Sequence, residues 1–177
     1  MYNGDRNDGQ GDFMSVVLDD GFVVFLMDLG SGMGLSRSVE RVSIGDWHNI
    51  TVQRTGGEIL LYVDTQTVTR SQSGGGFNQL SLSQHLWLGG VTDLMALPPA
   101  LSSNMLTGYT GCVSSLTINS LPVQLLYSAI ASVSVSSCDQ ADLQQQTEVR
   151  STPARHKVPA FSGRSYLAFN NSDIYTK

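Results

Sequence analysis

The side chains that most often perform acid–base or nucleophilic chemistry are few in this chain of 177 residues, which holds three histidines and two cysteines. His48 and His85 fall in or beside predicted strands, and His156 falls in a polar stretch near the end. A serine or cysteine nucleophile needs a neighbouring base, and no histidine stands in a recognisable nucleophile motif. The Gly-x-Ser-x-Gly elbow of hydrolases is also absent from the sequence. These residues therefore give no support to an enzyme.

Two loops have the composition of ligand-binding loops but the wrong spacing. Residues 1–12 contain Asp5, Asp8 and Asp12, yet the glycine falls one position too early for an EF-hand and no glutamate follows at the required distance. Residues 30–34 are glycine-rich, but they match neither Gly-x-Gly-x-x-Gly nor a Walker A motif, and lysine is missing. We interpret both loops as turns.

Cys112 and Cys138 are the minimum for one disulfide bond. Two buried thiols in a cytosolic protein would give the same composition, so the cysteine count by itself leaves both alternatives open.

Charge is distributed unevenly along the chain, whose formal net charge is −5. Residues 1–138 carry five arginines, no lysine and eleven acidic residues, which gives −6; residues 139–177 carry five basic and four acidic residues, which gives +1. A body without lysine is poorly suited to bind nucleic acid, an acidic bilayer or heparan sulfate. The sequence contains no apolar run of about 18 residues that would span a membrane, and we identify no signal peptide at its start.

The elements that must position any site are β-strands. The clearest strand–turn–strand unit is residues 46–64, where Ile50 and Val52 share one face of the first arm and a Gly-Gly pair makes the turn. Its second arm has apolar residues on both faces, which predicts a strand buried on both sides. Residues 13–18 and 22–29 predict a second pair of strands. With 18 glycines and 14% charged residues, the composition is typical of an all-β protein with many turns.

Four motifs together resemble laminin G-like (LamG/LNS) domains of extracellular matrix and cell-surface proteins. They are Leu-Gly-Ser-Gly at 29–32, Gly-Asp-Trp-His at 45–48, Leu-Trp-Leu-Gly-Gly at 86–90 and Gly-Cys at 111–112. The resemblance covers residues 12–138 and implies an all-β fold, an antiparallel β-sandwich of the laminin G-like or concanavalin-like jelly-roll type. Since the first matching segment normally follows the opening strands, we expect an N-terminally truncated domain.

The resemblance also implies a disulfide between Cys112 and Cys138, because family members join a Gly-Cys in a late strand to a cysteine at the C-terminal edge. An oxidising, extracellular location would follow, in a secreted matrix protein or the ectodomain of a surface protein. N-glycosylation sequons begin at Asn49 and Asn170. Asn49 alternates to the face opposite Ile50, so we expect it to be accessible.

Composition changes after Cys138. Residues 139–160 predict a linker, and residues 161–177 resemble the first strand of a following laminin G-like domain, which leaves residues 1–138 as a domain lacking its opening strands. Such a domain has a vacant edge that tends to recruit a strand. We therefore expect the tail to dock on its own domain, or on a second chain in a strand-swapped dimer. The alternative is that the tail waits for a downstream domain.

The function implied by the resemblance is a non-enzymatic extracellular binding or adhesion module that recognises a receptor or glycan through loops at the rim of the sandwich. Family members that bind Ca²⁺ hold it at this rim, and the matching positions here are Asp12, the Leu29 carbonyl, and Ser71 and Ser73. One carboxylate with neutral oxygens predicts a weak, millimolar site. The alternative is that Asp12 is a solvated turn residue.

A lectin-like carbohydrate-binding domain of a glycan-active enzyme is the competing function, because it has the same sandwich shape. Hydrolysis would need two carboxylates flanking a groove, and Glu40 and Glu58 are the only glutamates in residues 1–138.

Overall fold

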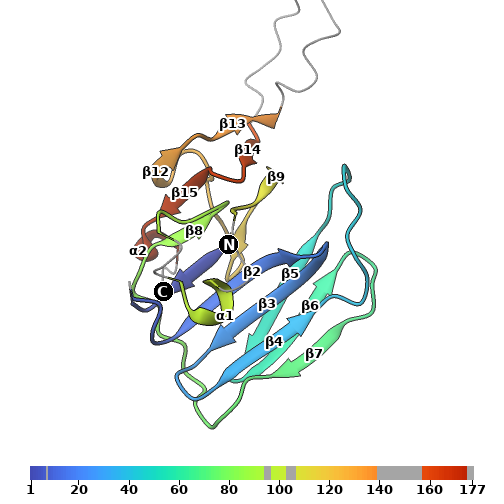
Figure 1. Cartoon of the computed structure of the whole chain (residues 1–177), viewed down its shortest axis with the longest axis vertical. Helices are drawn as coiled ribbons and strands as arrows, with labels where there is room; N and C mark the ends of the chain where they lie inside the picture. Colours follow the sequence, from blue (N-terminus) through green and yellow to red (C-terminus); the bar gives the residue numbers. More distant parts are fainter. Residues whose placement is uncertain (7, 94–96, 103–106, 139–156, 175–177) are drawn as a thin grey trace, which may run out of the picture. The chain divides into compact units, whose positions relative to one another are not determined.

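The computed structural model describes residues 1–6, 8–93, 97–102, 107–138 and 157–174. In these ranges the fold is all-β and antiparallel, as predicted, with two single-turn helices (Figure 1). The chain divides into two compact units, one formed by Met1–Leu86 and Asp93–Asn104 and the other by Trp87–Thr92 and Met105–Lys177. No helix in the described part of the chain has the length and apolar character needed to cross a membrane.

The first unit contains two antiparallel sheets. One follows the order β1 (Tyr2–Gly4), β2 (Phe13–Asp19), β3 (Phe22–Asp28) and β4 (Met33–Arg37). The other follows the order β5 (Ile50–Thr55), β6 (Glu58–Val63) and β7 (Thr69–Gln72). Helix α1 (Pro99–Ser102) belongs to the same unit.

The core of this unit lies between β3 and β6. Phe25 and Met27 of β3 pack in one cluster with Ile59 of β6, and Val23 packs in a second cluster with Leu61 and Val63. Clusters that join two facing sheets in this way define a β-sandwich.

The hairpin predicted at residues 46–64 is confirmed as β5 and β6. Thr55 pairs with Glu58, so Gly56-Gly57 forms a two-residue turn, and Gly56 has a φ of 57°. The prediction that the second arm is buried on both faces is wrong. In β6, buried residues alternate with half-buried ones because one face packs on β3 and the other is partly open to solvent.

The second unit contains the later strands. They are β8 (Leu86–Leu88), whose first residue belongs to the first unit, β9 (Thr110–Cys112), β10 (Thr117–Ile118), β11 (Leu121–Pro122), β12 (Ala129–Val133), β13 (Ser136–Ser137), β14 (Pro159–Ser162) and β15 (Tyr166–Phe169). Helix α2 (Asn171–Ile174) follows β15. β14 lies between β13 and β9, and β15 lies between β12 and β8.

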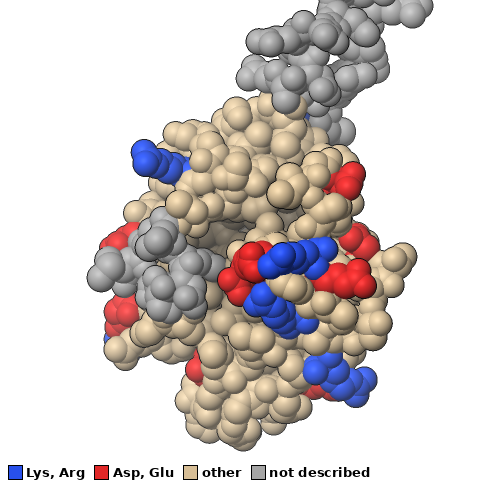
Figure 2. Space-filling view, turned by 45° about the vertical axis from the view of Figure 1, so that its right-hand side comes forward, with Lys and Arg blue, Asp and Glu red and all other residues tan. Residues whose placement is uncertain are grey.

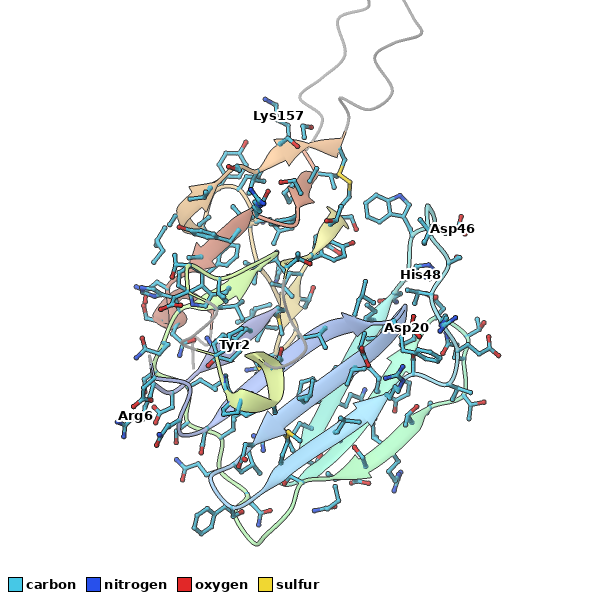
Figure 3. The ribbon with its side chains drawn as sticks, in the orientation of Figure 1. Tyr2, Arg6, Asp20, Asp46, His48 and Lys157 are labelled. Atoms are coloured by element: carbon cyan, nitrogen blue, oxygen red, sulfur yellow. A yellow bond between two sulfur atoms is a disulfide. The ribbon has the colours of Figure 1, made fainter. Side chains whose placement is uncertain are left out.

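A disulfide joins Cys112, at the end of β9, to Cys138, directly after β13, as the family resemblance implied. Its sulfur atoms are drawn in yellow in Figure 3. The two cysteines lie 6.2 Å apart at their Cα atoms, and the bond ties β9 to the end of β13, the two strands that flank β14.

The prediction that the tail docks is confirmed, since β14 and β15 both pair with strands of the same chain. β14 begins at Pro159, so the last two residues of the predicted linker belong to a strand. Residues 139–156 lie outside the described part of the chain. The assignment of residues 161–177 to a following domain stays a prediction.

Charged side chains are mixed rather than sorted into patches on the face drawn in Figure 2, where blue and red groups adjoin at its centre. Arg6, Arg37, Arg41 and Arg70 each form an ion pair with an acidic side chain. Arg54 instead donates to the Gly56 carbonyl at 2.7 Å. Every arginine of residues 1–138 therefore has an acceptor within the described part of the chain.

Candidate functional site at the sandwich rim

The loops at one end of the first unit meet around Asp12. We call this surface the rim and define it as Asp12, residues 29–33, the Gly56-Gly57 turn and residues 73–81. Asp12 Oδ2 accepts from the Ser81 amide at 2.8 Å. The hydroxyl of Ser31 donates to the Gly74 carbonyl at 3.2 Å.

The Gly56-Gly57 turn is connected to the same surface, because Arg54 Nη1 beside it donates to the Asn78 carbonyl at 3.1 Å. Three loops from different strands are thus held to one another by hydrogen bonds.

Asp12 and Leu29 lie together, as the calcium prediction requires. Phe13 pairs with Asp28 in the β2–β3 ladder, and extending this register by one residue places Asp12 opposite Leu29. A methyl group built on Gly30 would lie 3.2 Å from Asp12 Oδ1, so the carboxylate lies beside the peptide that follows Leu29. The Leu29 side chain itself is buried, with 2% of its surface exposed.

Asp28 is a further rim residue that our sequence reasoning missed. Its Oδ1 accepts from the amides of Gly30 at 2.8 Å and Gly32 at 3.2 Å. A carboxylate that bonds amides two and four residues onward fixes the turn between β3 and β4. An aspartate two residues before a glycine was the signal in the sequence that could have identified it.

Ser71 and Ser73 face the interior of the sandwich rather than solvent at the rim. Ser71 pairs with the buried Ile59, and only 4% of Ser73 is exposed. A methyl group on Gly57 would lie 2.8 Å from Ser73 Oγ. Both hydroxyls lack a hydrogen-bond partner among the described atoms.

The predicted calcium ligands therefore fall into two groups, those that could contact a cation at the rim and those that could not. The Asp12 carboxylate and the Leu29 carbonyl suit a hard cation that prefers oxygen ligands, whereas the two serine hydroxyls point into the core. Among the described residues, no three His, Cys, Asp or Glu side chains gather as a metal-binding group. Any calcium here would depend on one carboxylate and backbone oxygens, which is the composition of a weak site.

A serine, a histidine and an aspartate also meet where the connection after β4 approaches the end of β6; the histidine, His48, is labelled in Figure 3. His48 Nδ1 lies 2.6 Å from Asp64 Oδ2, and His48 Nε2 lies 3.2 Å from the Ser43 hydroxyl. Sequence reasoning missed this arrangement because Asp64 is 16 residues from His48 and because Ser43 lies in an irregular connection with no pattern that fixes its position. The order of the three groups resembles a catalytic triad, so the hydrogen bonds of the histidine decide whether it can act as a general base.

The hydrogen bonds of His48 make it a poor general base. Its Nε2 also lies 3.0 Å from the Ser43 carbonyl oxygen, and the Ser43 hydroxyl lies 2.7 Å from Asp46 Oδ2. Both ring nitrogens thus face oxygen acceptors, which favours the doubly protonated ring. The hydrogen bond to Asp64 is the main cause that raises the pKa of His48, with the Ser43 carbonyl second. We interpret the group as a structural clamp.

The pKa of Asp64 shifts in the opposite direction, below its ordinary value. The Asn49 amide, which donates to its Oδ1 at 2.7 Å, is the main cause that lowers the pKa of Asp64, and the bond from His48 adds to it.

The two glutamates considered for glycan hydrolysis lie far apart. Glu58 begins β6 and its carboxylate pairs with Arg70 at 2.8 Å, whereas Glu40 bonds through its amide to Gln66, beyond the other end of β6. The length of a six-residue strand separates them by more than about 15 Å, but glycosidase carboxylates lie about 5–9.5 Å apart. The geometry does not suit that reaction.

Both predicted glycosylation positions lie on the surface. Asn49 precedes β5 and Asn170 follows β15, and both side chains are exposed.

Comparison with known proteins places the chain in a family. Residues 1–124 match the Laminin G domain. The chain belongs to the laminin G domain family. It is 26% identical over 188 residues to rat pikachurin, which covers 92% of this chain and 18% of that protein.

Two further relatives have higher identity to this laminin G domain over shorter segments. The mouse basement membrane-specific heparan sulfate proteoglycan core protein is 32% identical over 138 residues, covering 78% of this chain and 4% of that protein. Mouse neurexin-2 is 33% identical over 130 residues, covering 70% of this chain and 7% of that protein. The chain spans less than a fifth of the length of each of these relatives.

Proposed function

We propose that this laminin G domain is a non-enzymatic binding module of an extracellular matrix or cell-surface protein, and that it recognises a receptor or glycan through the rim. The observation that carries the proposal is the meeting of three loops around Asp12, fixed by hydrogen bonds from Ser81, Ser31 and Arg54. Loops held on a rigid sandwich are where binding surfaces commonly form. Family membership and the disulfide support an extracellular, non-catalytic role.

Calcium assistance belongs to the same proposal. The Asp12 carboxylate and the Leu29 carbonyl would hold the ion, and Ser71 and Ser73 are left out of the ligand set because they face the core. A bound Ca²⁺ would supply a positive charge with open coordination positions for oxygen atoms of a partner.

Calorimetric titration of the intact protein with CaCl₂ tests the calcium site. We expect millimolar binding that Asp12→Asn abolishes and Ser73→Ala leaves unchanged. Asp20→Asn is the matched control, because Asp12 and Asp20 are single carboxylates directly before and after β2. Binding that survives Asp12→Asn would show that calcium binds elsewhere, without refuting recognition by the rim.

The rim itself is tested with a glycan array and a panel of purified basement-membrane proteins, with and without calcium. Phe77 is an apolar rim residue that is 61% exposed, so Phe77→Ala should weaken binding to the recognised partner by roughly tenfold or more if it is an anchor. Tyr127, 87% exposed in the second unit, gives a matched control. Loss of binding in Tyr127→Ala but not in Phe77→Ala would refute the rim as the site.

Passage through the secretory pathway should modify the exposed sequons at Asn49 and Asn170. Peptide mapping of protein secreted from animal cells tests this, and unmodified asparagine at both positions would contradict it.

A further inference from the structure

The tail segment, defined as residues 159–169, contains the two strands β14 and β15, and each of them has a neighbouring strand on both sides. β14 has β13 on one side and β9 on the other, with Ala160 opposite both Ser136 and Cys112. β15 lies between β12 and β8. The rest of the unit therefore offers two open slots, and the tail segment fills both.

The apolar side chains of the tail segment are among the most buried in the molecule. Leu167 and Phe169 have no exposed surface, and Phe161 is 4% exposed. The ring of Phe161 lies 6.2 Å from that of Tyr109, and Tyr166 packs edge-on against Trp87 at 5.2 Å between ring centroids. Burial of this extent makes the tail segment part of the core of its unit.

Two glycines directly after β8 leave the space that the tail segment occupies. A methyl group on Gly89 would overlap the Phe161 ring, and one on Gly90 would lie 3.0 Å from the Ser165 carbonyl oxygen. The turn between β14 and β15 is held by the segment before β9. The Gly163 carbonyl accepts from the Gly108 amide at 2.8 Å, and the Gly163 amide donates to the Tyr109 carbonyl at 3.0 Å.

A buried serine adds a directional contact. Ser165 has no exposed surface, and its hydroxyl donates to the Ser134 carbonyl at 2.6 Å while accepting from the Ser162 amide at 3.1 Å. A buried hydroxyl that is fully hydrogen-bonded specifies one register, because a shifted strand would leave it without partners.

Apart from the Ser162–Ser165 hydrogen bond, which lies within the tail segment, these contacts join the tail segment to residues 87–138, and none requires that both belong to one chain. We propose that the two slots bind the tail segment of a second copy as they bind their own, so that the protein can form a strand-exchanged dimer. The connection in one chain is residues 139–158, and its ends are adjacent, because the Cys138 amide donates to the Val158 carbonyl at 3.0 Å. A connection of about 20 residues between adjacent ends keeps the tail segment near its own slots at an effective concentration of roughly millimolar, which favours the monomer in dilute solution. Shortening the connection removes that advantage.

The first experiment changes only the connection. Deleting residues 139–156 leaves Lys157 alone between Cys138 and Val158, which is too short for a turn that keeps these two residues paired. We expect a dimer by light scattering, with residues 159–169 as protected from hydrogen exchange as in the unaltered protein. The matched control keeps residue 139 and replaces residues 140–156 by Asn-Gly, which allows a two-residue hairpin, and should be monomeric. A monomeric deletion variant with an exchanging tail would overturn the proposal.

A second experiment tests whether the slots accept the tail segment of another copy even if the deletion variant does not fold. A protease site is introduced within residues 139–156 of the full chain, and the protein is cleaved after it has folded. An isotopically heavy and a light preparation are treated in this way and then mixed. Native mass spectrometry should find heavy tails on light bodies. Tails that leave the body on cleavage, or that never change bodies, would overturn the proposal.

The cleaved protein also tests which residues define the slots. Gly89→Ala should weaken retention of the tail roughly tenfold, because a methyl group there meets the Phe161 ring and Gly89 has a φ of 90°. The loss should be smaller on a Phe161→Ala background, where the ring is gone. Arg164→Ala is the control, because this side chain is exposed within the same segment. Equal losses in Gly89→Ala and Arg164→Ala would refute the slot as described.

Discussion

At the scale of single residues, the ion pair between His48 and Asp64 joins the segment before β5 to the end of β6. The Nδ1 atom of His48 faces the Asp64 carboxylate at 2.6 Å, and 18% of the histidine side chain is exposed. Because the folded pKa of His48 lies above its ordinary value of 6.5, the contribution of His48 to stability is complete below about pH 6.5 and is lost as pH rises through the folded pKa. Asp64, with a pKa below its ordinary 3.8, loses its contribution as pH falls through that lower value.

We predict that Asp64→Asn lowers the pKa of His48 towards 6.5, measured by NMR titration of the imidazole Cε1 proton. The thermal midpoint of the unaltered protein should exceed that of Asp64→Asn most between about pH 4 and 6.5, and the difference should shrink at higher pH. Asp46→Asn should shift the His48 pKa much less, because Asp46 acts on the imidazole only through its charge. A His48 titration that is the same in Asp64→Asn and the unaltered protein would refute the clamp.

Single residues also show what a sequence can predict about a site. Asp12 and Leu29 were found through the family resemblance, and they lie together because the antiparallel register brings strand ends together. The inward direction of the Ser71 and Ser73 side chains could not be predicted, because it depends on which face of the chain packs on the core at the end of β7, and period-two alternation leaves that choice open. Ser43 and Asp64 were missed because a loop brings them to His48.

At the scale of elements, strands with regular alternation and a glycine turn were predicted well, as β5 and β6 show. The apolar residues at 113–118 and 121–126 are also typical of strands, but only the two-residue strands β10 and β11 form there. The apolar–polar–apolar stretch at residues 80–82 also suits a strand, yet none forms there, and the Ser81 amide donates to Asp12 Oδ2. A side-chain acceptor here takes the place of a sheet partner for one amide, and strand propensity does not report that competition.

The β10–β11 turn carries a strain that can be relieved. Asn119 and Ser120 have φ values of 50° and 67° in the turn that joins Ile118 to Leu121, and a type I′ turn prefers glycine at its second central position. We predict that Ser120→Gly raises the free energy of unfolding by up to about 1 kcal/mol, measured by urea denaturation. Ser136→Gly, in β13, should lower it by up to about 1 kcal/mol instead. The same sign of change in both variants would contradict this explanation.

At the scale of the whole molecule, the two units differ in what holds them. The first has a core between two sheets, whereas the second has short strands, a central tail segment and a covalent bond between β9 and β13. Short strands bury little surface, so a cross-link is a common source of stability in such regions. The fold of both units was predictable from family motifs, but the place of the tail in the second unit was only one of several alternatives, because pairing between distant segments leaves no local signal.

We predict that replacing both Cys112 and Cys138 by serine destabilises the second unit by about 3–4 kcal/mol, since the bond spans a sequence separation of 26. Amide exchange in residues 159–162 should accelerate, because β14 lies between the two cross-linked strands. Exchange in β2 and β3 of the first unit gives the internal comparison and should change little. Thiol labelling of the unreduced, denatured protein checks that the disulfide is present in the unaltered protein, and two reactive thiols per chain would contradict it.

The position of β14 between β9 and β13 has a consequence for biosynthesis. A ribosome completes Cys138 before it reaches Pro159, so for roughly one to four seconds at ordinary elongation rates the nascent chain holds both outer strands without the inner one. During that interval two unpaired backbone edges face each other, and any extended peptide nearby competes for them. If the protein is secreted as proposed, oxidation of Cys112 and Cys138 before Pro159 is made would hold the two edges in register until their own strand arrives, and the timing of disulfide formation would then be part of correct maturation.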